Sequence, residues 1–324
     1  VLQLVEQGLI DLDADVGDYL PFHVRNPEYP ETVVTSKMLL THQAGLANTF
    51  PDSTYYDNDD IALEWAAENL DFELSTSPYL EGRPSHAEYV ESHFLPGGKN
   101  AGAEIWIDEP GARMLYSNLG LAHLVPYLIE EVSGEAWADY IDGHILEPLG
   151  MTETSFDASD FAETRLAVPH TRVEGEFLAL PITGMNATGK LRTTVPDLAR
   201  FLAAHMNAGR LNDAVILQSG SVATMHEEHL SLRGDDWGEL TLDGEGLGWW
   251  LWLPDLEGHG GHVPGYSARM MMSERDAGAY GIVLMLNVGC SLQCDEDWYN
   301  DHVVAIRELL LEEAAAQYAA RAAE

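Results

Sequence analysis

The chain has 324 residues, of which 46% are hydrophobic and 9% aromatic. This composition is enough to fill the core of one large domain and excludes a disordered chain. Its 54 acidic residues against 16 basic ones give a formal net charge of −38, spread along the whole chain, which excludes nucleic acid and anionic lipid as partners.

The acidic excess also favours adaptation to concentrated salt. The chain has three lysines, Lys37, Lys99 and Lys190. In molar salt the Debye length falls to about 3 Å, so repulsion between surface carboxylates is screened. In dilute buffer the same charges should push the fold apart. We therefore expect an acidic, halophilic protein.

The first part of the chain has the periodicity of helices. Residues 1–16 place Leu2, Leu4, Val5 and Leu9 on one face, which predicts an amphipathic helix. Residues 75–103 carry prolines, glycines and charges without periodicity, which indicates an irregular excursion near the mouth of a cleft. No stretch approaches the roughly 20 apolar residues of a membrane span. Capping and stop residues predict further helices over 36–41, 61–70, 118–132, 137–149 and 197–207.

The last third changes to a strand pattern. Residues 247–253 are rich in aromatics, and 266–273 and 280–288 are apolar runs around the turn residues 275–278, which predicts a hairpin of buried antiparallel strands. A long amphipathic helix over 297–322 is expected to cover one face of that sheet. We predict an α+β fold in which residues 1–324 form a single domain. Its mostly helical lobe runs to about residue 235, its sheet and C-terminal helix lobe covers about 236–324, and a cleft lies between them.

The tripeptide Tyr116-Ser117-Asn118 stands between a predicted loop and a predicted helix. One interpretation is a buried tyrosine followed by an asparagine that caps the helix. The other is catalytic: a phenol can relay a proton if nearby cations lower its pKa, and an asparagine amide can bind an acyl group. The two interpretations are compatible, because a side chain at the start of a helix is held rigidly at a cleft.

The segment His259-Gly260-Gly261-His262 predicts a strand edge that a substrate can approach closely. The backbone N–H of His262 would then face a developing oxyanion. The alternative is a histidine pair on zinc, joined by His226 and His229, but nothing ties these pairs into the three ligands that a catalytic zinc needs. We expect no metal and no cofactor. Cys290 and Cys294 are interpreted as small, buried or half-buried side chains.

Five segments occur in an order that resembles the β-lactamase-related serine hydrolases. This family includes class C β-lactamases, penicillin-binding proteins, D-amino-acid peptidases and carboxylesterases. The resemblance implies a β-lactamase/transpeptidase-like fold, with an antiparallel sheet flanked by helices. It also implies proton transfer by Tyr116, substrate binding by Asn118, and His259-Gly260-Gly261 in the place of a Lys-Thr-Gly strand. The segments are MLLTHQAGL (38–46), YSN (116–118), EPLGMTETSF (147–156), GKLRTTVPDLARF (189–201) and GHGGHVPGY (258–266).

The nucleophile of that family, the serine of Ser-x-x-Lys, has no counterpart in this chain. No serine is followed by a lysine three residues later. Ser117 is not a substitute, because no lysine or histidine at helical spacing can act as its base. We expect that the chain is truncated, and that the N-terminal strands and the start of the nucleophile helix precede Val1. The alternative is a chain that never had the pair and binds without cleaving.

The predicted function is a serine hydrolase that acts through an acyl-enzyme on a small-molecule ester, amide or lactam. Histidine in place of lysine at position 259 removes a permanent positive charge, which favours an esterase-like preference. Alternatives are a β-lactamase or D-amino-acid/DD-peptidase, a non-catalytic binding protein that keeps the cleft, and a metallohydrolase. The sequence leaves the oligomeric state open, and also the compartment, for which the cytoplasm is favoured.

Overall fold

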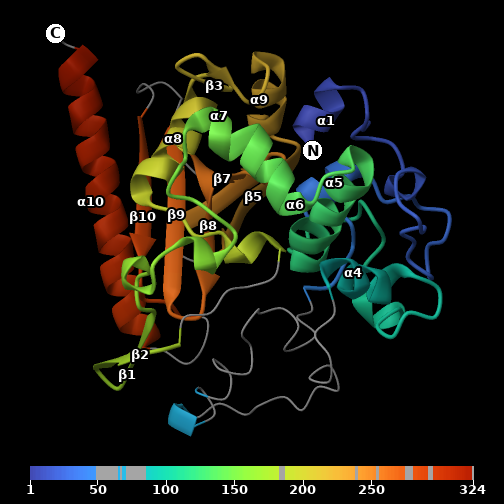
Figure 1. Ribbon diagram of the computed structural model, residues 1–324, viewed down its shortest axis with the longest axis horizontal. Coiled ribbons are helices and arrows are strands. Elements are labelled where there is room, and N and C mark those ends of the chain that lie inside the picture. The colour runs from blue at the N-terminus through green and yellow to red at the C-terminus, as the bar shows by residue number, and fades with distance from the viewer. Residues whose placement is uncertain are drawn as a thin grey trace.

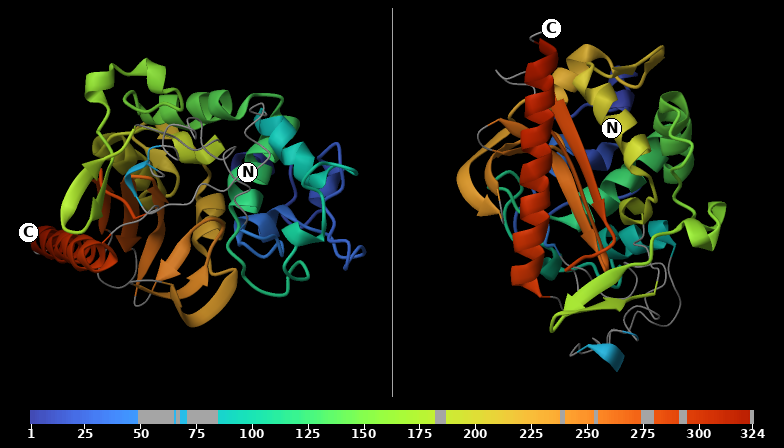
Figure 2. Two further views of the ribbon diagram at one scale, coloured as in Figure 1. Left: turned by 90° about the horizontal axis from the view of Figure 1, so that it is seen from below. Right: turned by 90° about the vertical axis from the view of Figure 1, so that its left-hand side faces the viewer.

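A computed structural model describes residues 1–48, 65, 68–70, 85–181, 187–237, 240–252, 255–273, 280–290 and 295–322. Figure 1 shows an α+β arrangement in which a six-stranded antiparallel sheet lies between the long helix α10 and the helices of the first part of the chain. The predicted fold class is confirmed. Figure 2 shows α10 running along the sheet.

The helical part packs around one large apolar core, in which Leu4, Leu39, Leu119 and Leu128 are almost fully buried. Leu9, predicted on the buried face of the first helix, is 46% exposed, because that helix ends before it. The helices are α1 (Leu2–Glu6), α2 (Ser36–Leu40), α4 (His86–Phe94), η5 (Leu119–Leu124), α5 (Val125–Ser133), α6 (Trp137–Ile141), η6 (Asp142–Leu146), α7 (Glu147–Leu149), α8 (Val195–Met206), α9 (Ser219–His226) and α10 (Glu296–Ala322). Short 3-10 turns are η1 (Val16–Asp18), η4 (Ala103–Ile105), η7 (Ala158–Asp160), η8 (Glu163–Arg165) and η9 (Ala187–Lys190).

Helix boundaries follow the caps. Thr35 and Thr194 accept from backbone N–H groups at the starts of α2 and α8, and Gly134 and Gly150 end α5 and α7 in the left-handed conformation. Pro148 does not break its helix, since it lies in the first turn of α7. Of the helix predicted over 61–70, residues 65, 68 and 69 are helical; the other residues of 61–67 lie outside the described part.

The main sheet is a meander with the order β10-β9-β8-β7-β6-β5. Alternate residues of β9 face opposite layers: Met270 and Met272 pack toward α8, and Met271 packs toward α10. The sheet begins at Leu230, before the predicted boundary near 236. The strands are β5 (Leu230–Trp237), β6 (Leu240–Glu245), β7 (Trp250–Trp252), β8 (Leu256–Val263), β9 (Tyr266–Ser273) and β10 (Tyr280–Leu286).

Two small hairpins, β1–β2 (His170–Val173 and Glu176–Ala179) and β3–β4 (Arg210–Leu211 and Ala214–Val215), were not predicted. They are too short to show a strand period in the sequence. Cys290, interpreted from the sequence only as a small, buried or half-buried side chain, is disulfide-bonded; Cys294 lies outside the described residues. In the part of the chain that the structure describes, no helix is both long and apolar enough to span a membrane.

Candidate active site

The tripeptide Tyr116-Ser117-Asn118 is held by the loop that follows α2. The N–H of Ser117 donates to His42 Nδ1 at 3.2 Å, and Ser117 Oγ donates to the carbonyl oxygen of Ala47 at 2.9 Å. The same hydroxyl accepts from the N–H of Gly120 at 3.2 Å. Because Ser117 is buried and its hydroxyl is engaged in these bonds, its role is to fix the segment rather than to attack a substrate.

Asn118 immediately precedes η5, but its side chain makes no capping hydrogen bond, so its predicted role as a cap is wrong. Instead, Asn118 Nδ2 donates to Asn48 Oδ1 at 3.2 Å, and Asn118 Oδ1 accepts from the Tyr116 hydroxyl at 3.3 Å. The turn of η5 is π-helical, and the Ser117 hydroxyl caps its start. The Asn118 amide therefore lies beside the phenol.

Tyr116 is enclosed by rings from both halves of the molecule. Its ring centroid lies 4.4 Å from that of His42 and 6.2 Å from that of Trp250 on β7. Burial raises the pKa of Tyr116, the hydrogen bond with Asn118 opposes this, and the nearby Glu245 carboxyl raises it further. The expectation that nearby cations lower this pKa is therefore not met within the described residues. The phenol is protonated at neutral pH.

The segment His259-Gly260-Gly261-His262 lies on β8, as predicted for a strand edge. Strand β7 pairs with β8 only as far as the Trp250–Gly258 pair, whereas β9 continues alongside to Val263. Among the described strands, none pairs with the second edge of β8 beyond Gly258. A Cβ at Gly258 would lie 2.0 Å from the Met270 carbonyl oxygen, while a Cβ at Gly261 would meet open space. The exposed edge at Gly261 leaves room for a ligand.

The two histidines of this segment have different surroundings. The His259 ring packs at a tilt against the Trp250 ring, with centroids 4.3 Å apart, and burial lowers the pKa of His259 to about 4, so it is neutral at pH 7. His262 Nε2 lies 2.8 Å from Arg269 Nη2, so this nitrogen accepts from the guanidinium. Neither histidine supplies a positive charge at neutral pH.

Three residues that the sequence analysis did not select connect the two halves: His42, Glu245 and Trp250. His42 Nε2 lies 3.8 Å from Glu245 Oε1, and both side chains are at most 1% exposed. Glu245, at the end of β6, pairs with Trp250, whose ring lies between those of Tyr116 and His259. His42 was part of the quoted segment 38–46, but spacing along the chain does not show that it meets a glutamate on the sheet.

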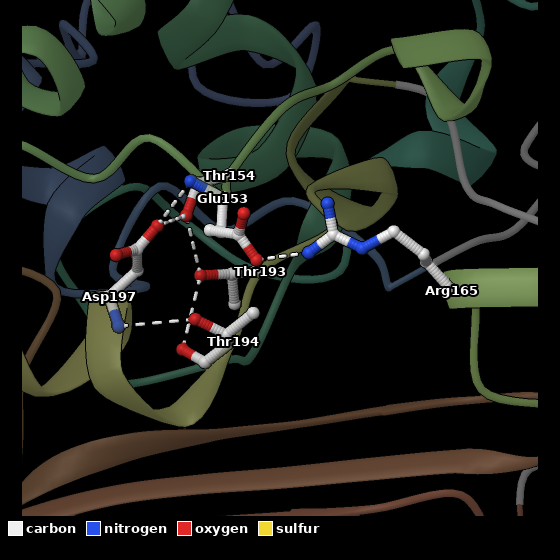
Figure 3. Close-up of polar contacts among 6 residues, drawn as sticks. All are labelled: Glu153, Thr154, Arg165, Thr193, Thr194 and Asp197. Atoms are coloured by element: carbon white, nitrogen blue, oxygen red, sulfur yellow. Dashed lines mark hydrogen bonds and ion pairs between the residues drawn. The ribbon is translucent and has the colours of Figure 1, made fainter. Parts of the chain in front are cut away.

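The segments 147–156 and 189–201 meet at the start of α8 through a group of polar contacts (Figure 3). Asp197, in the first turn of α8, accepts from the Glu153 N–H at 2.7 Å and from Thr154 Oγ1 at 2.9 Å. Thr194 Oγ1 accepts from the Asp197 N–H at 3.3 Å, and Thr154 and Thr193 hydroxyls lie 2.7 Å apart. This buried network fixes the loop after α7 against α8, which is a structural role.

The histidines considered for zinc are used in other contacts. His226 lies 3.1 Å from His205 and 2.9 Å from Glu257, measured between ring nitrogens and the carboxylate, and His229 Nε2 contacts the Thr224 carbonyl at 2.7 Å. Among the residues that the structure places, no group of three histidine, cysteine or acidic side chains is arranged to hold a metal.

Comparisons with known proteins identify the family and the fold. The protein family described as Beta-lactamase matches residues 1–301. Penicillin-binding protein 4 of Amycolatopsis lactamdurans is 26% identical over 274 residues, which is 82% of this chain and 61% of that protein. The chain spans about half the length of the curated relatives it matches.

Two solved structures are similar in fold. The octameric penicillin-binding protein homologue from Pyrococcus abyssi has a TM-score of 0.66 at 24% identity, covering 88% of this chain and 58% of that one. The D-amino acid amidase from Ochrobactrum anthropi SV3, solved with L-phenylalanine amide, has a TM-score of 0.60 at 24% identity, covering 88% of this chain and 72% of that one.

Proposed function

The chain belongs to the beta-lactamase family of serine hydrolases, and on this premise we propose that it is part of a hydrolase that cleaves a small acyl substrate through an acyl-enzyme. The observation that carries the proposal is that Tyr116, bonded to Asn118, and His259 of β8 both contact the ring of Trp250, beside the stretch of β8 that β7 leaves unpaired. In this proposal, Tyr116 transfers the proton, and the Asn118 amide binds the acyl group.

The open edge of β8 supports a role for this strand in stabilising the negative charge of the oxyanion. The turn Pro264-Gly265, with Gly265 at φ +75°, is typical of a type II turn, in which Val263 and Tyr266 are hydrogen-bonded. Hydrogen-bonded pairs alternate along an antiparallel ladder, so the N–H of His262 is expected to point away from β9. We assign this N–H to the oxyanion.

The nucleophile is the part that this sequence does not contain in Ser-x-x-Lys form. We propose that it is supplied by residues outside the printed sequence, a view supported by the greater length of the curated relatives. The alternative, a binding protein that keeps the cleft without cleaving, is supported only by that missing pair.

A serine-reactive fluorophosphonate separates these two functions. We expect the 324-residue chain to remain unlabelled. We expect the natural-length protein, meaning a form that also contains the proposed nucleophile segment, to be labelled at one serine, because the base and the oxyanion hole lower the reaction barrier at that serine alone. The matched control is the natural-length protein with that serine changed to alanine. Strong labelling of the 324-residue chain at a single serine would contradict the assignment, and an unlabelled natural-length protein would favour the binding protein.

The substrate preference that we propose is for small neutral esters. A carboxylate-bearing lactam or peptide would need a cation on β8, and His259, with its pKa lowered to about 4, supplies none at neutral pH. We expect the natural-length protein to have a higher kcat/KM for a short-chain nitrophenyl ester than for a chromogenic cephalosporin at pH 8, and His259→Lys to narrow the difference. A faster cephalosporin reaction would instead favour a lactamase or a peptidase.

A further inference from the structure

Glu245 is a buried acid, and a contribution to the stability of the fold does not explain why an acid stands at this position. It is 0% exposed at the end of β6, and neither carboxyl oxygen has a hydrogen-bond partner among the described residues. Removing a carboxyl group from water without such partners is costly, and an apolar residue of similar volume is often better tolerated. A residue that weakens the fold points to a function.

The ionisable neighbour of Glu245 is His42, and a hydrogen bond from Ser117 determines which nitrogen of the His42 ring carries the proton. His42 Nδ1 accepts from the Ser117 N–H at 3.2 Å, so the ring proton resides on Nε2 and the imidazole is neutral. That Nε2 atom lies 3.8 Å from Glu245 Oε1. The carboxyl group thus faces the N–H of a histidine whose tautomer is fixed by the candidate catalytic tripeptide.

His42 holds that tripeptide by two contacts and the residue before it, Leu115, by a third. Its carbonyl oxygen accepts from the Leu115 N–H at 2.7 Å, its Nδ1 accepts from the Ser117 N–H, and its ring packs on Tyr116 with centroids 4.4 Å apart. His42 adopts φ 52°, a left-handed conformation that is uncommon outside glycine. Strain of this kind persists where the surrounding structure holds a functional residue in place.

We propose that Glu245 is a positioning residue for the hydrolysis, acting through His42 to hold Tyr116 in front of the open edge of β8; this inference rests on the proposed function. Glu245 belongs to the sheet, and His42 belongs to the helical part. Their contact therefore sets the position of Tyr116 and Asn118 relative to β8. A displacement of about 1 Å at a reacting group is sufficient to lower a rate about 10²-fold.

The charge of Glu245 gives the positioning a pH dependence. The titratable groups that face it are His42, Tyr116 and, one ring further, His259. Burial raises the pKa of Glu245 to about 8, so the group is neutral below this pH and negative above it. The negative charge opposes loss of the Tyr116 proton, so turnover is expected to fall as pH rises through about 8.

The raised pKa of Glu245 also makes the stability of the fold depend on pH. Because the pKa of Glu245 is raised from 4.5 in the unfolded chain to about 8 in the folded one, the folded state binds the additional proton between these values. The contribution of Glu245 to stability therefore declines as pH rises from about 4.5 to about 8. Glu245→Met lacks this decline, so its advantage in melting temperature over the wild type should widen across that range.

The experiment compares Glu245→Met and Glu245→Gln in the natural-length protein at constant molar KCl. We expect Glu245→Met to raise the melting temperature and to lower kcat about 10-fold or more with little change in KM. Glu245→Gln should lose the fall in turnover through pH 8. The matched control is Glu257→Gln, at the other histidine–glutamate pair, which should keep both kcat and the pH profile. A Glu245→Met protein with kcat within twofold of wild type overturns the proposal, as does a melting temperature that falls together with kcat.

A readout without catalysis separates this inference from the proposed function. The Ser117 backbone amide resonance of the same protein reports its hydrogen bond to His42, and we expect it to shift in Glu245→Met and not in Glu257→Gln. An unshifted Ser117 amide in Glu245→Met overturns the positioning role even in an active hydrolase. If the wild-type protein neither hydrolyses the ester nor reacts with the fluorophosphonate, the proposed function fails. A shifted Ser117 amide in Glu245→Met would then show that Glu245 sets only the geometry of the tripeptide.

Discussion

At the scale of single residues, Tyr116 has the features of a proton donor before substrate binds. Burial and the Glu245 carboxyl raise its pKa, so the phenol carries its proton at neutral pH and directs it to Asn118 Oδ1 at 3.3 Å. To accept a proton from a nucleophile, the phenol needs a cation nearby that lowers its pKa. In the proposed enzyme, the lysine of the nucleophile motif would supply that charge.

Removal of the phenol oxygen tests this role. In the natural-length protein, Tyr116→Phe is expected to lower kcat/KM by roughly 10²-fold or more, as loss of a general acid–base group does. The matched control is Tyr127→Phe, which removes another phenol from the helical part, bonded to Glu91 at 3.1 Å. Kinetics and melting temperatures of both variants are measured together. If Tyr116→Phe loses stability but keeps its turnover, Tyr116 is an ordinary core tyrosine.

The resemblance in motif order was sufficient to select Tyr116, Asn118 and the segment 259–262, and in the structure Tyr116 and His259 contact the same ring, that of Trp250. It was not sufficient for His42 and Glu245, because their contact joins residues about 200 positions apart and belongs to no local pattern. The helix-capping interpretation of the Asn118 side chain was also wrong. Capping preferences are local, and here Asn48 and Tyr116 compete successfully for the amide.

At the scale of elements, the start of α8 is the point where the segments 147–156 and 189–201 are joined by polar contacts. The Asp197 carboxyl lies in the first helical turn, where a negative charge is favourable, and it is 4% exposed. It satisfies one backbone and one hydroxyl donor of the loop after α7. Loss of this acceptor would leave buried donors without a partner.

Asp197→Ala is therefore expected to lower the free energy of unfolding by about 2–4 kcal/mol, through loss of charge-assisted hydrogen bonds to buried donors. Arg165→Ala is the matched control, because it removes an exposed ion pair with Glu153 from the same network and should cost less than about 1 kcal/mol. Denaturant unfolding in molar KCl measures both. Equal losses in the two variants would contradict the structural role of the buried carboxyl.

Long elements with a regular apolar pattern were predictable from the sequence, and short or irregular elements were not. The residues of β9, β10 and α10 follow their predicted ranges closely, because each has a continuous apolar pattern and clear ends. The π-helical turns η5 and η6 were not foreseen, since each is a short segment that runs directly into an α-helix and is too short to show a period of its own. The β1–β2 hairpin depends on tertiary contacts at the edge of the molecule.

At the scale of the whole molecule, the negative charge is far greater than ion pairs between neighbouring residues can offset. Each of the 16 basic residues can offset at most one of the 54 acidic ones, which leaves the formal charge of −38. The described ion pairs include exposed examples such as Arg113–Asp108 and Arg165–Glu153, which contribute little in water. Repulsion among the remaining carboxylates is a property of the whole surface, so it responds to ionic strength rather than to any one contact.

The melting temperature is accordingly expected to rise steeply as KCl increases from dilute buffer to molar concentration. The physical reason is that the Debye length shortens from about 30 Å at 0.01 M salt to about 3 Å at 1 M, which screens repulsion in the compact state. Excluded solutes also stabilise folded proteins, so a series in sucrose is the control: sucrose favours burial without screening charge. We expect the steepest rise with KCl at low concentration, with a smaller and steadier rise in sucrose. A melting temperature that is flat in KCl would mean that neighbouring groups compensate the charges locally, and the halophilic interpretation would be wrong.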